Sequence, residues 1–196
     1  MIFTGSVLAG GVSFAEPLIQ DYQYHYSTTD DGKAKVSERQ ITWRNQGLVE
    51  EFSGKQVDYL VHNWRNADRS ADLYVRSGYG EFETNKGLFN PYGEAMISGI
   101  EYNYQDPRIY TSAKFESYYG QDYIKKFRQE LRLGLKNLDL GDDGISSMFM
   151  LVASRISDVE DGFKLTPALQ LFGDDFNTEI DFDLDGEIKF NFTYKW

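Results

Sequence analysis

The last ten residues of the chain alternate without interruption between apolar and polar side chains. The apolar parity holds Ile188, Phe190, Phe192, Tyr194 and Trp196, and the polar parity holds Glu187, Lys189, Asn191, Thr193 and Lys195. Successive side chains of a β-strand point to opposite faces. This segment is therefore expected to form an amphipathic strand, with an aromatic-rich face that extends to the final residue.

The same alternation recurs along most of the sequence, and the alternating segments are separated by turn residues such as Asn, Asp and Gly. The predicted strands are 18–26, 36–44, 56–64, 72–80, 96–104, 109–118, 127–136, 145–156, 163–172, 177–184 and 187–196. Residues 45–55 are ambiguous, because 48–52 is either a further short strand or part of a loop. The pattern predicts an all-β protein with a single antiparallel up-and-down transmembrane β-barrel of twelve strands, with ten as the alternative.

Composition excludes several classes of protein. The mean hydropathy of −0.52 rules out a bundle of transmembrane helices, but it fits a membrane barrel, whose strands present only one face to lipid. The chain has 14 Tyr, 14 Phe and 3 Trp, a supply that a barrel would use as aromatic girdles. A net charge of −11 makes nucleic acid a poor partner.

Residues 1–15 have the composition of an export signal. They are apolar and small, and Ser13-Phe14-Ala15 places small residues where a signal peptidase reads them. The basic segment that normally precedes such a stretch is missing, so we expect a truncated signal peptide at 1–15 and the barrel at 16–196. The alternative is that residues 2–8 form a first β-strand.

The polar parity has a different role in each environment. In a soluble sandwich it faces water, whereas in a membrane barrel it faces the lumen and the apolar parity faces lipid. The second arrangement predicts membrane-facing aromatic residues at Phe190, Phe192, Tyr194 and Trp196. It predicts a pore lined by Arg44, Lys114, Glu116, Arg128, Glu130, Arg132, Lys136, Arg155, Asp181, Asp183 and Lys189. By the same parity rule, Arg39 shares a face with Ile41 and Trp43 and is expected to point outward.

Two resemblances follow from these residues. The aromatic C-terminal strand resembles the sorting signal of Gram-negative outer-membrane β-barrels, which implies recognition by the barrel-assembly machinery and contact with outer-membrane lipid and lipopolysaccharide. The segments 22–26 (YQYHY) and 37–44 (SERQITWR), together with the strand 129–136 (QELRLGLK), resemble the oligogalacturonate-specific porin family. That resemblance implies a monomeric twelve-stranded channel for the passive uptake of acidic oligosaccharides, guided by inward Arg and Lys side chains.

The sequence predicts no enzyme, cofactor or metal site. Its two histidines, His25 and His62, stand in no recognisable catalytic pattern, and the acidic turn near Asp139 lacks the full calcium-binding loop. The predicted function is an outer-membrane channel for small hydrophilic, charged solutes. Two alternatives stay open: a closed structural or adhesive outer-membrane barrel, and a secreted soluble β-barrel that holds a ligand inside.

Overall fold

The computed structural model describes residues 2–9, 18–29, 32–45, 47–85, 92–120, 124–139, 146–157, 162–173, 176–182 and 188–195. All regular structure in these ranges is β-strand, which confirms the all-β prediction. The strands are β1 (Ile2–Ala9), β2 (Leu18–Thr28), β3 (Ala34–Asn45), β4 (Leu48–Arg65), β5 (Ser70–Thr84), β6 (Tyr92–Gln105), β7 (Ile109–Gly120), β8 (Ile124–Asp139), β9 (Ser146–Ile156), β10 (Lys164–Phe172), β11 (Phe176–Phe182) and β12 (Ile188–Lys195). No helix long and apolar enough to cross a membrane occurs in the described part of the chain.

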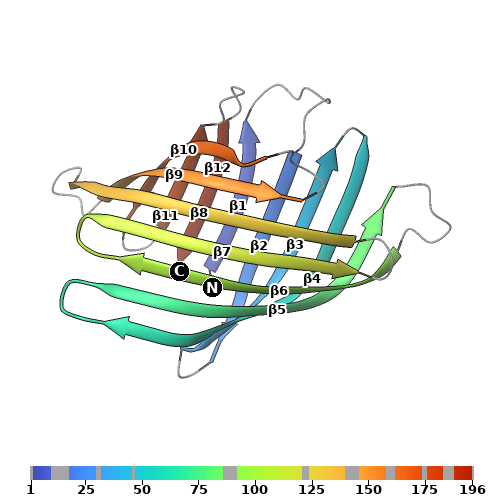
Figure 1. Ribbon diagram of the computed structural model, residues 1–196, viewed down its shortest axis with the longest axis horizontal. Helices are drawn as coiled ribbons and strands as arrows, with labels where there is room; N and C mark the ends of the chain where they lie inside the picture. The colour runs from blue at the N-terminus through green and yellow to red at the C-terminus, as the bar shows by residue number, and fades with distance from the viewer. Residues whose placement is uncertain are drawn as a thin grey trace.

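Each strand pairs antiparallel with its neighbours in sequence, so the sheet has the predicted up-and-down topology. The nine consecutive strands β3 to β11 form one continuous curved sheet, and β12, β1 and β2 complete an order in which β1 lies between β12 and β2. Ile2 pairs with Lys195, so both ends of the chain lie at one rim, here called the terminal rim. The opposite rim, which carries the β3–β4, β5–β6 and β7–β8 connections, is the distal rim (Figure 1).

Two segments differ from the sequence interpretation. Residues 48–52 are not a separate strand, because Leu48–Arg65 forms the single strand β4. Gly47 has a φ of 83° and turns the chain between β3 and β4. Gly54 instead lies inside β4, where an added Cβ would come within 2.5 Å of the Tyr79 carbonyl oxygen. Gly54 therefore permits close approach of two strands rather than ending one.

The first strand occupies residues that the sequence assigns to a signal peptide. Ile2–Ala9 pairs along eight residues with β12 but along only three with β2. This placement agrees with the alternative interpretation, in which residues 2–8 are a strand. Cleavage after residue 15 stays a prediction.

The outer face of β4 to β10 carries a continuous band of exposed apolar side chains. Neighbouring strands contribute directly paired members, such as Tyr59 with Val75 and Val75 with Ile100. Leu131 and Leu133 of β8 are 55% and 52% exposed, as their parity predicts. The band comprises Val57, Tyr59, Val75, Ile100, Tyr102, Phe115, Leu131, Leu133, Leu135, Phe149, Leu151 and Leu165. Exposed apolar surface of this extent marks an interaction surface.

Near the distal rim, the outer face of β3 to β6 becomes polar. Glu38, Gln40 and Arg44 of β3 are exposed, and Gln40 donates a 2.5 Å hydrogen bond to Glu51 of β4. The same strands turn apolar residues inward at this level, including Ile41 and Phe52. The wall is thus apolar outside over its middle and polar outside near the distal rim.

Candidate functional site: a charged constriction inside the barrel

Eleven charged side chains meet inside the barrel at mid-height and form one connected set of ion pairs, here called the ionic layer. Its acidic members are Asp21, Asp58, Glu101, Glu116, Glu130 and Glu179, and its basic members are Arg39, Arg76, Lys114, Arg128 and Arg132. They come from eight strands, β2 to β8 and β11. Buried charges are tolerated when they are paired and hydrogen-bonded, which explains why so many share one layer.

Glu116 of β7 is the centre of this layer, with a side chain that is 0% exposed. Arg39 of β3 contacts both of its oxygens, with Nη1 donating at 2.7 Å to Oε1 and Nη2 donating at 3.1 Å to Oε2. Arg76 of β5 forms a further ion pair with Oε1, and the Tyr118 hydroxyl donates at 2.7 Å to Oε2. Bidentate contacts of this kind fix the relative orientation of the two side chains as well as neutralising their charges.

Arg39 also forms a bidentate contact with the carboxylate of Asp21 on β2. Its Nε donates to Oδ1 at 2.9 Å and its Nη2 donates to Oδ2 at 2.6 Å. Arg128 of β8 donates to the same Oδ2 at 2.8 Å. In the closed strand order β2 and β8 are six positions apart in either direction. The Arg128–Asp21 contact therefore joins opposite walls across the interior.

The basic residues of β8 share Glu130 as a counter-ion. Arg128 and Arg132 each approach it at 2.8 Å, and Lys114 of β7 approaches it at 3.7 Å. Arg132 continues to Glu179 of β11, also at 2.8 Å. The alternation of β8 predicts this arrangement, because residues 128, 130 and 132 share one face.

Exposure to water is graded across the ionic layer. The Arg39 side chain is 2% exposed, and Glu116 is sealed entirely. The exposed fraction is higher for Lys114 at 15%, Arg128 at 16%, Asp21 at 22% and Arg132 at 25%. Glu101 on β6 is 23% exposed, whereas Glu130 and Glu179 are only 5% and 9% exposed. The layer thus has a dry centre at Arg39 and Glu116, and water reaches several side chains around it. The basic groups of β7 and β8 that water reaches face acidic groups of β2 and β11.

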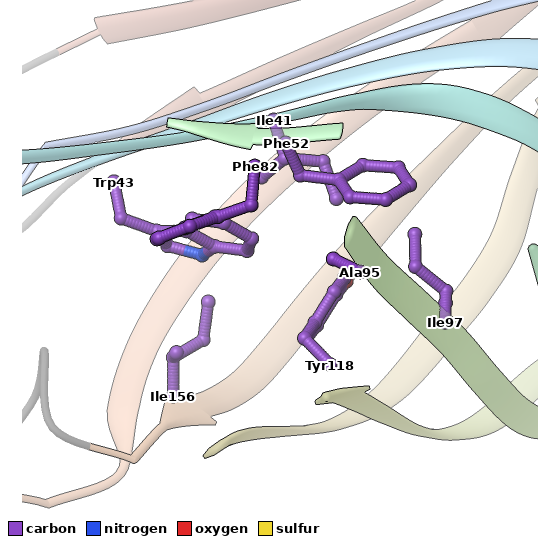
Figure 2. Close-up of a cluster of buried hydrophobic side chains, with 8 residues drawn as sticks. All are labelled: Ile41, Trp43, Phe52, Phe82, Ala95, Ile97, Tyr118 and Ile156. Atoms are coloured by element: carbon purple, nitrogen blue, oxygen red, sulfur yellow. The ribbon is translucent and has the colours of Figure 1, made fainter. Parts of the chain in front are cut away.

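An apolar layer lies between the ionic layer and the distal rim. Along β3 toward the distal rim, Ile41 and Trp43 come after Arg39 and also point inward. Along β7 in the same direction, Tyr118 comes after Glu116. The complete cluster is Ile41, Trp43, Phe52, Phe82, Ala95, Ile97, Tyr118 and Ile156. Its side chains converge from different strands, and Ile156 is drawn next to the Trp43 ring (Figure 2). The strands that carry these two residues, β9 and β3, are again six positions apart in either direction.

A buried ion pair borders the apolar layer. Lys126 Nζ lies 2.6 Å from Glu50 and 5.8 Å from the ring centroid of Trp43, within the range of a cation–π contact. Trp43 in turn packs edge-on against Tyr118, with ring centroids 5.1 Å apart. Tyr118 therefore links the two layers, because its ring belongs to one and its hydroxyl to the other.

The structure places five of the predicted pore-lining residues in the ionic layer: Lys114, Glu116, Arg128, Glu130 and Arg132. Asp181 has a buried carboxylate oxygen and lies two residues from Glu179 on β11. Lys136 lies at the terminal-rim end of β8 and donates a 3.0 Å hydrogen bond to Gln105. These placements agree with the inward direction predicted for them.

Three predicted side-chain directions are wrong. Arg44 and Arg155 are exposed on the outer face, with the parity of Gln40 and Leu151 respectively, and Arg39 points inward. The physical reason on β3 is that the interior near the distal rim is itself apolar, so Ile41 and Trp43 face inward and take Arg39 with them. Arg155 has the parity of the outer apolar residues of β9 and pairs with exposed Gln129.

For the remaining predicted residues no side-chain position is described. Asp183 and Trp196 are outside the described ranges, and for Lys189, Phe190, Phe192 and Tyr194 only the backbone is described. That backbone pairs in regular register, with Lys189 opposite Asp181 and Phe190 opposite Ile180.

Sequence reasoning missed four members of the ionic layer besides Arg39, and these are Asp21, Asp58, Arg76 and Glu101. The remaining member, Glu179, has the inward parity predicted for Asp181 and Asp183. Each of the four missed residues lies on a strand where both parities carry polar residues, so alternation alone gives no direction. One available signal was the pair Gly78 and Gly80, which share the parity of Arg76. Glycine in a strand often marks close approach, and an added Cβ at Gly80 would meet the Ser53 carbonyl oxygen at 2.2 Å.

No model of a known protein family matches the chain, and no curated protein matches it.

Proposed function

We propose that the chain is a twelve-stranded transmembrane barrel of a Gram-negative outer membrane and a channel for small hydrophilic, charged solutes. The observation that carries the proposal is the inversion of polarity over the middle of the wall, where charged side chains lie inside and Leu131, Leu133 and Val75 lie exposed outside. Water would not favour such an apolar band, whereas the hydrocarbon of a bilayer would.

The band has the layout of a membrane-facing surface. Aliphatic residues such as Val75, Ile100 and Leu131 occupy its middle together with Tyr59, which pairs with Val75, and further exposed tyrosines flank it on both sides. Tyr79 and Tyr119 mark the edge toward the distal rim, and Tyr102 lies toward the terminal rim. Aromatic girdles at both interfaces are typical of outer-membrane barrels. With an even number of strands, the terminal rim would face the periplasm and the distal rim the exterior.

The part of the ionic layer where basic groups of β7 and β8 face β2 and β11 is the candidate solute path. Lys114, Arg128 and Arg132 form a basic track on β7 and β8, and Asp21 and Glu179 face it from β2 and β11. Opposed rows of charge produce a transverse field that favours charged or strongly hydroxylated solutes over apolar ones. Acidic oligosaccharides fit this field, because arginine binds carboxylates through paired hydrogen bonds.

Reversal-potential measurements in planar bilayers under a salt gradient test the channel. Arg128→Ala and Arg132→Ala each remove a positive charge from the proposed path, so both should shift the ion preference toward cations, and the double variant should shift it further. Arg155→Ala is the matched control, because it removes the same charge from the outer face of the next strand. Equal reversal potentials for all of these variants and the wild type would show that Arg128 and Arg132 of β8 do not line the solute path.

The closed barrel is the second candidate, and a specific observation favours it. Both the Arg128–Asp21 ion pair and the Trp43–Ile156 cluster join opposite walls, so the described conformation is bridged at two levels. A barrel filled in this way would carry no current at any applied potential. Membrane insertion itself is tested separately by detergent dependence and by a change in gel migration on boiling, and a water-soluble monomer would contradict both candidates.

A further inference from the structure

We infer that the apolar layer is the gate of this channel and that Trp43 is its moving part. The inference rests on the proposed channel and adds to it the barrier that holds it closed. Two barriers of different chemistry cross the interior: the ionic layer at mid-height and the apolar layer near the distal rim. The members of the apolar layer are at most 4% exposed, whereas Lys114, Arg128 and Arg132 of the ionic layer are 15–25% exposed. Among the described residues the apolar layer is therefore the tighter barrier to ions and hydrophilic solutes.

The apolar layer has the composition of a dewetting gate. Trp43, Phe52 and Phe82 supply large rings from β3, β4 and β5, and Ile156 closes the gap from β9 on the opposite wall. In Figure 2 the Trp43 and Phe82 rings are drawn between Phe52 on one side and Ile156 on the other. The charges at this level, Lys126 and Glu50, are paired with each other. A constriction built of large apolar groups excludes ions because it excludes their hydration water.

Trp43 is singled out by an unpaired donor. Its side chain is 2% exposed, yet no acceptor among the described residues lies within hydrogen-bond distance of the indole nitrogen Nε1. A buried donor without a partner is unfavourable, because it has lost its bond to water and gained none. The closed position of Trp43 therefore carries a penalty that a rotation toward water or toward the ionic layer would relieve.

The neighbours of Trp43 are suited to such a movement. Tyr118 contacts the indole edge at one side and Glu116 through its hydroxyl at the other. Lys126 lies over the indole ring and is itself held by Glu50. Arg128 lies on the proposed path and 3.9 Å from Glu116. A solute anion that binds Arg128 would weaken its attraction for Glu116 and thereby disturb Tyr118 and the packing of Trp43. The ionic layer and the gate are in this way mechanically connected.

Mean current through planar bilayers at fixed potential tests the gate. Trp43→Ala removes the ring and should raise the current several-fold, with a reversal potential equal to that of the wild type. Trp43→Phe keeps most of the ring and removes only the unpaired donor, so its current should equal or fall below that of the wild type. Trp64→Ala is the matched control, because Trp64 lies exposed on the outer face near the terminal rim and should leave the current unchanged.

A second gate variant protects the test against a folding defect. Phe82→Ala opens the same layer from β5 and should also raise the current, and the gel shift on boiling identifies which variants fold. Wild-type current in both Trp43→Ala and Phe82→Ala, while Arg128→Ala still shifts the reversal potential, would overturn the gate and leave the channel. An equal rise in Trp43→Phe and Trp43→Ala would also overturn it, because ring volume would not be the barrier. Absence of current in every variant would remove the channel and the gate together.

Discussion

β3 and β8 both alternate between apolar and polar residues. However, near the distal rim β3 turns its apolar side chains toward the interior, whereas β8 turns its charged side chains inward. On β8 the polar parity of Arg128, Glu130 and Arg132 faces inward and the leucines face outward. On β3 Ile41 and Trp43 face inward, while Glu38, Gln40 and Arg44 are exposed. The difference teaches that alternation identifies two faces but does not assign them, because the assignment depends on what lies against each face at that height.

The two strands nevertheless share one structural centre. Arg39 of β3 and Arg128 of β8 both contact Asp21, and both lie near Glu116, at 2.7 Å and 3.9 Å respectively. Arg39 belongs to an otherwise apolar inward parity, and Arg128 belongs to a charged one. The common carboxylates explain how strands with different patterns can form the same layer.

The largest predicted effect comes from removing this common centre. Glu116→Ala would leave Arg39 and Arg76 buried without their shared counter-ion, and breaking a buried ion pair from one side costs about 3–5 kcal/mol. Urea unfolding in detergent micelles should show the loss as a lower midpoint. Glu81→Ala is the control, because Glu81 is exposed on the outer face of β5. Equal midpoints for the two variants would show that the ionic layer does not hold β3 and β8 together.

Much of the fold follows from the sequence, for reasons visible in particular elements. Strand positions from 96 onward follow from strict alternation, and the turn at 105–107 follows from Asp and Pro. The β3–β4 region could not be predicted in the same way, because glycines at 47 and 54 look alike in sequence. Only the first has a positive φ, and the second lies in a strand against β5.

The charged site was predictable on β7 and β8 but not on β2 to β6. Apolar residues dominate one parity of β8, so burial and exposure leave a single consistent arrangement for Arg128 and Arg132. On β5 the parity of Arg76 also contains two glycines and Phe82, whereas the other parity contains Ser77 and two glutamates. Side-chain contacts across the interior, which join residues as distant as Asp21 and Arg128, decide such strands, and no local pattern records them.

The outer faces of the two strands should respond differently to the same new charge. Leu133→Arg on β8 would place a cation in the apolar band. If this band faces lipid as proposed, the arginine should cost about 2–4 kcal/mol near the bilayer midplane. Gln40→Arg on β3 would place it beside Glu51 on a polar surface and should be close to neutral. Unfolding by urea from lipid vesicles measures both. A similar loss in both variants would mean that the outer face of β3 near the distal rim also contacts lipid.

The smallest predicted effect separates the two strands at their terminal-rim ends. The end of β8 is held by the turn between β6 and β7, where the Asp106 carboxylate accepts hydrogen bonds from the backbone nitrogens of Arg108 at 2.7 Å and Ile109 at 2.6 Å. The Arg108 carbonyl oxygen in turn accepts a hydrogen bond from the backbone nitrogen of Lys136 at 2.8 Å. These backbone donors hold the pKa of Asp106 below its usual value, chiefly through the Arg108 bond.

At the end of β3 the Ala34 nitrogen donates to the Thr29 hydroxyl at 3.0 Å, and Gly32 turns the chain with a φ of 70°. The hydroxyl and backbone groups of this contact do not titrate. A depressed carboxyl pKa adds stability above the pKa of the unfolded chain, and that stability is lost as pH falls through the folded-state pKa. Hydrogen-exchange protection of the Ile109 amide should therefore fall below about pH 4, while that of Ala34 stays constant. Asp106→Asn should remove the pH dependence at Ile109, and a parallel fall at both amides would indicate general loosening of the rim rather than titration of this turn.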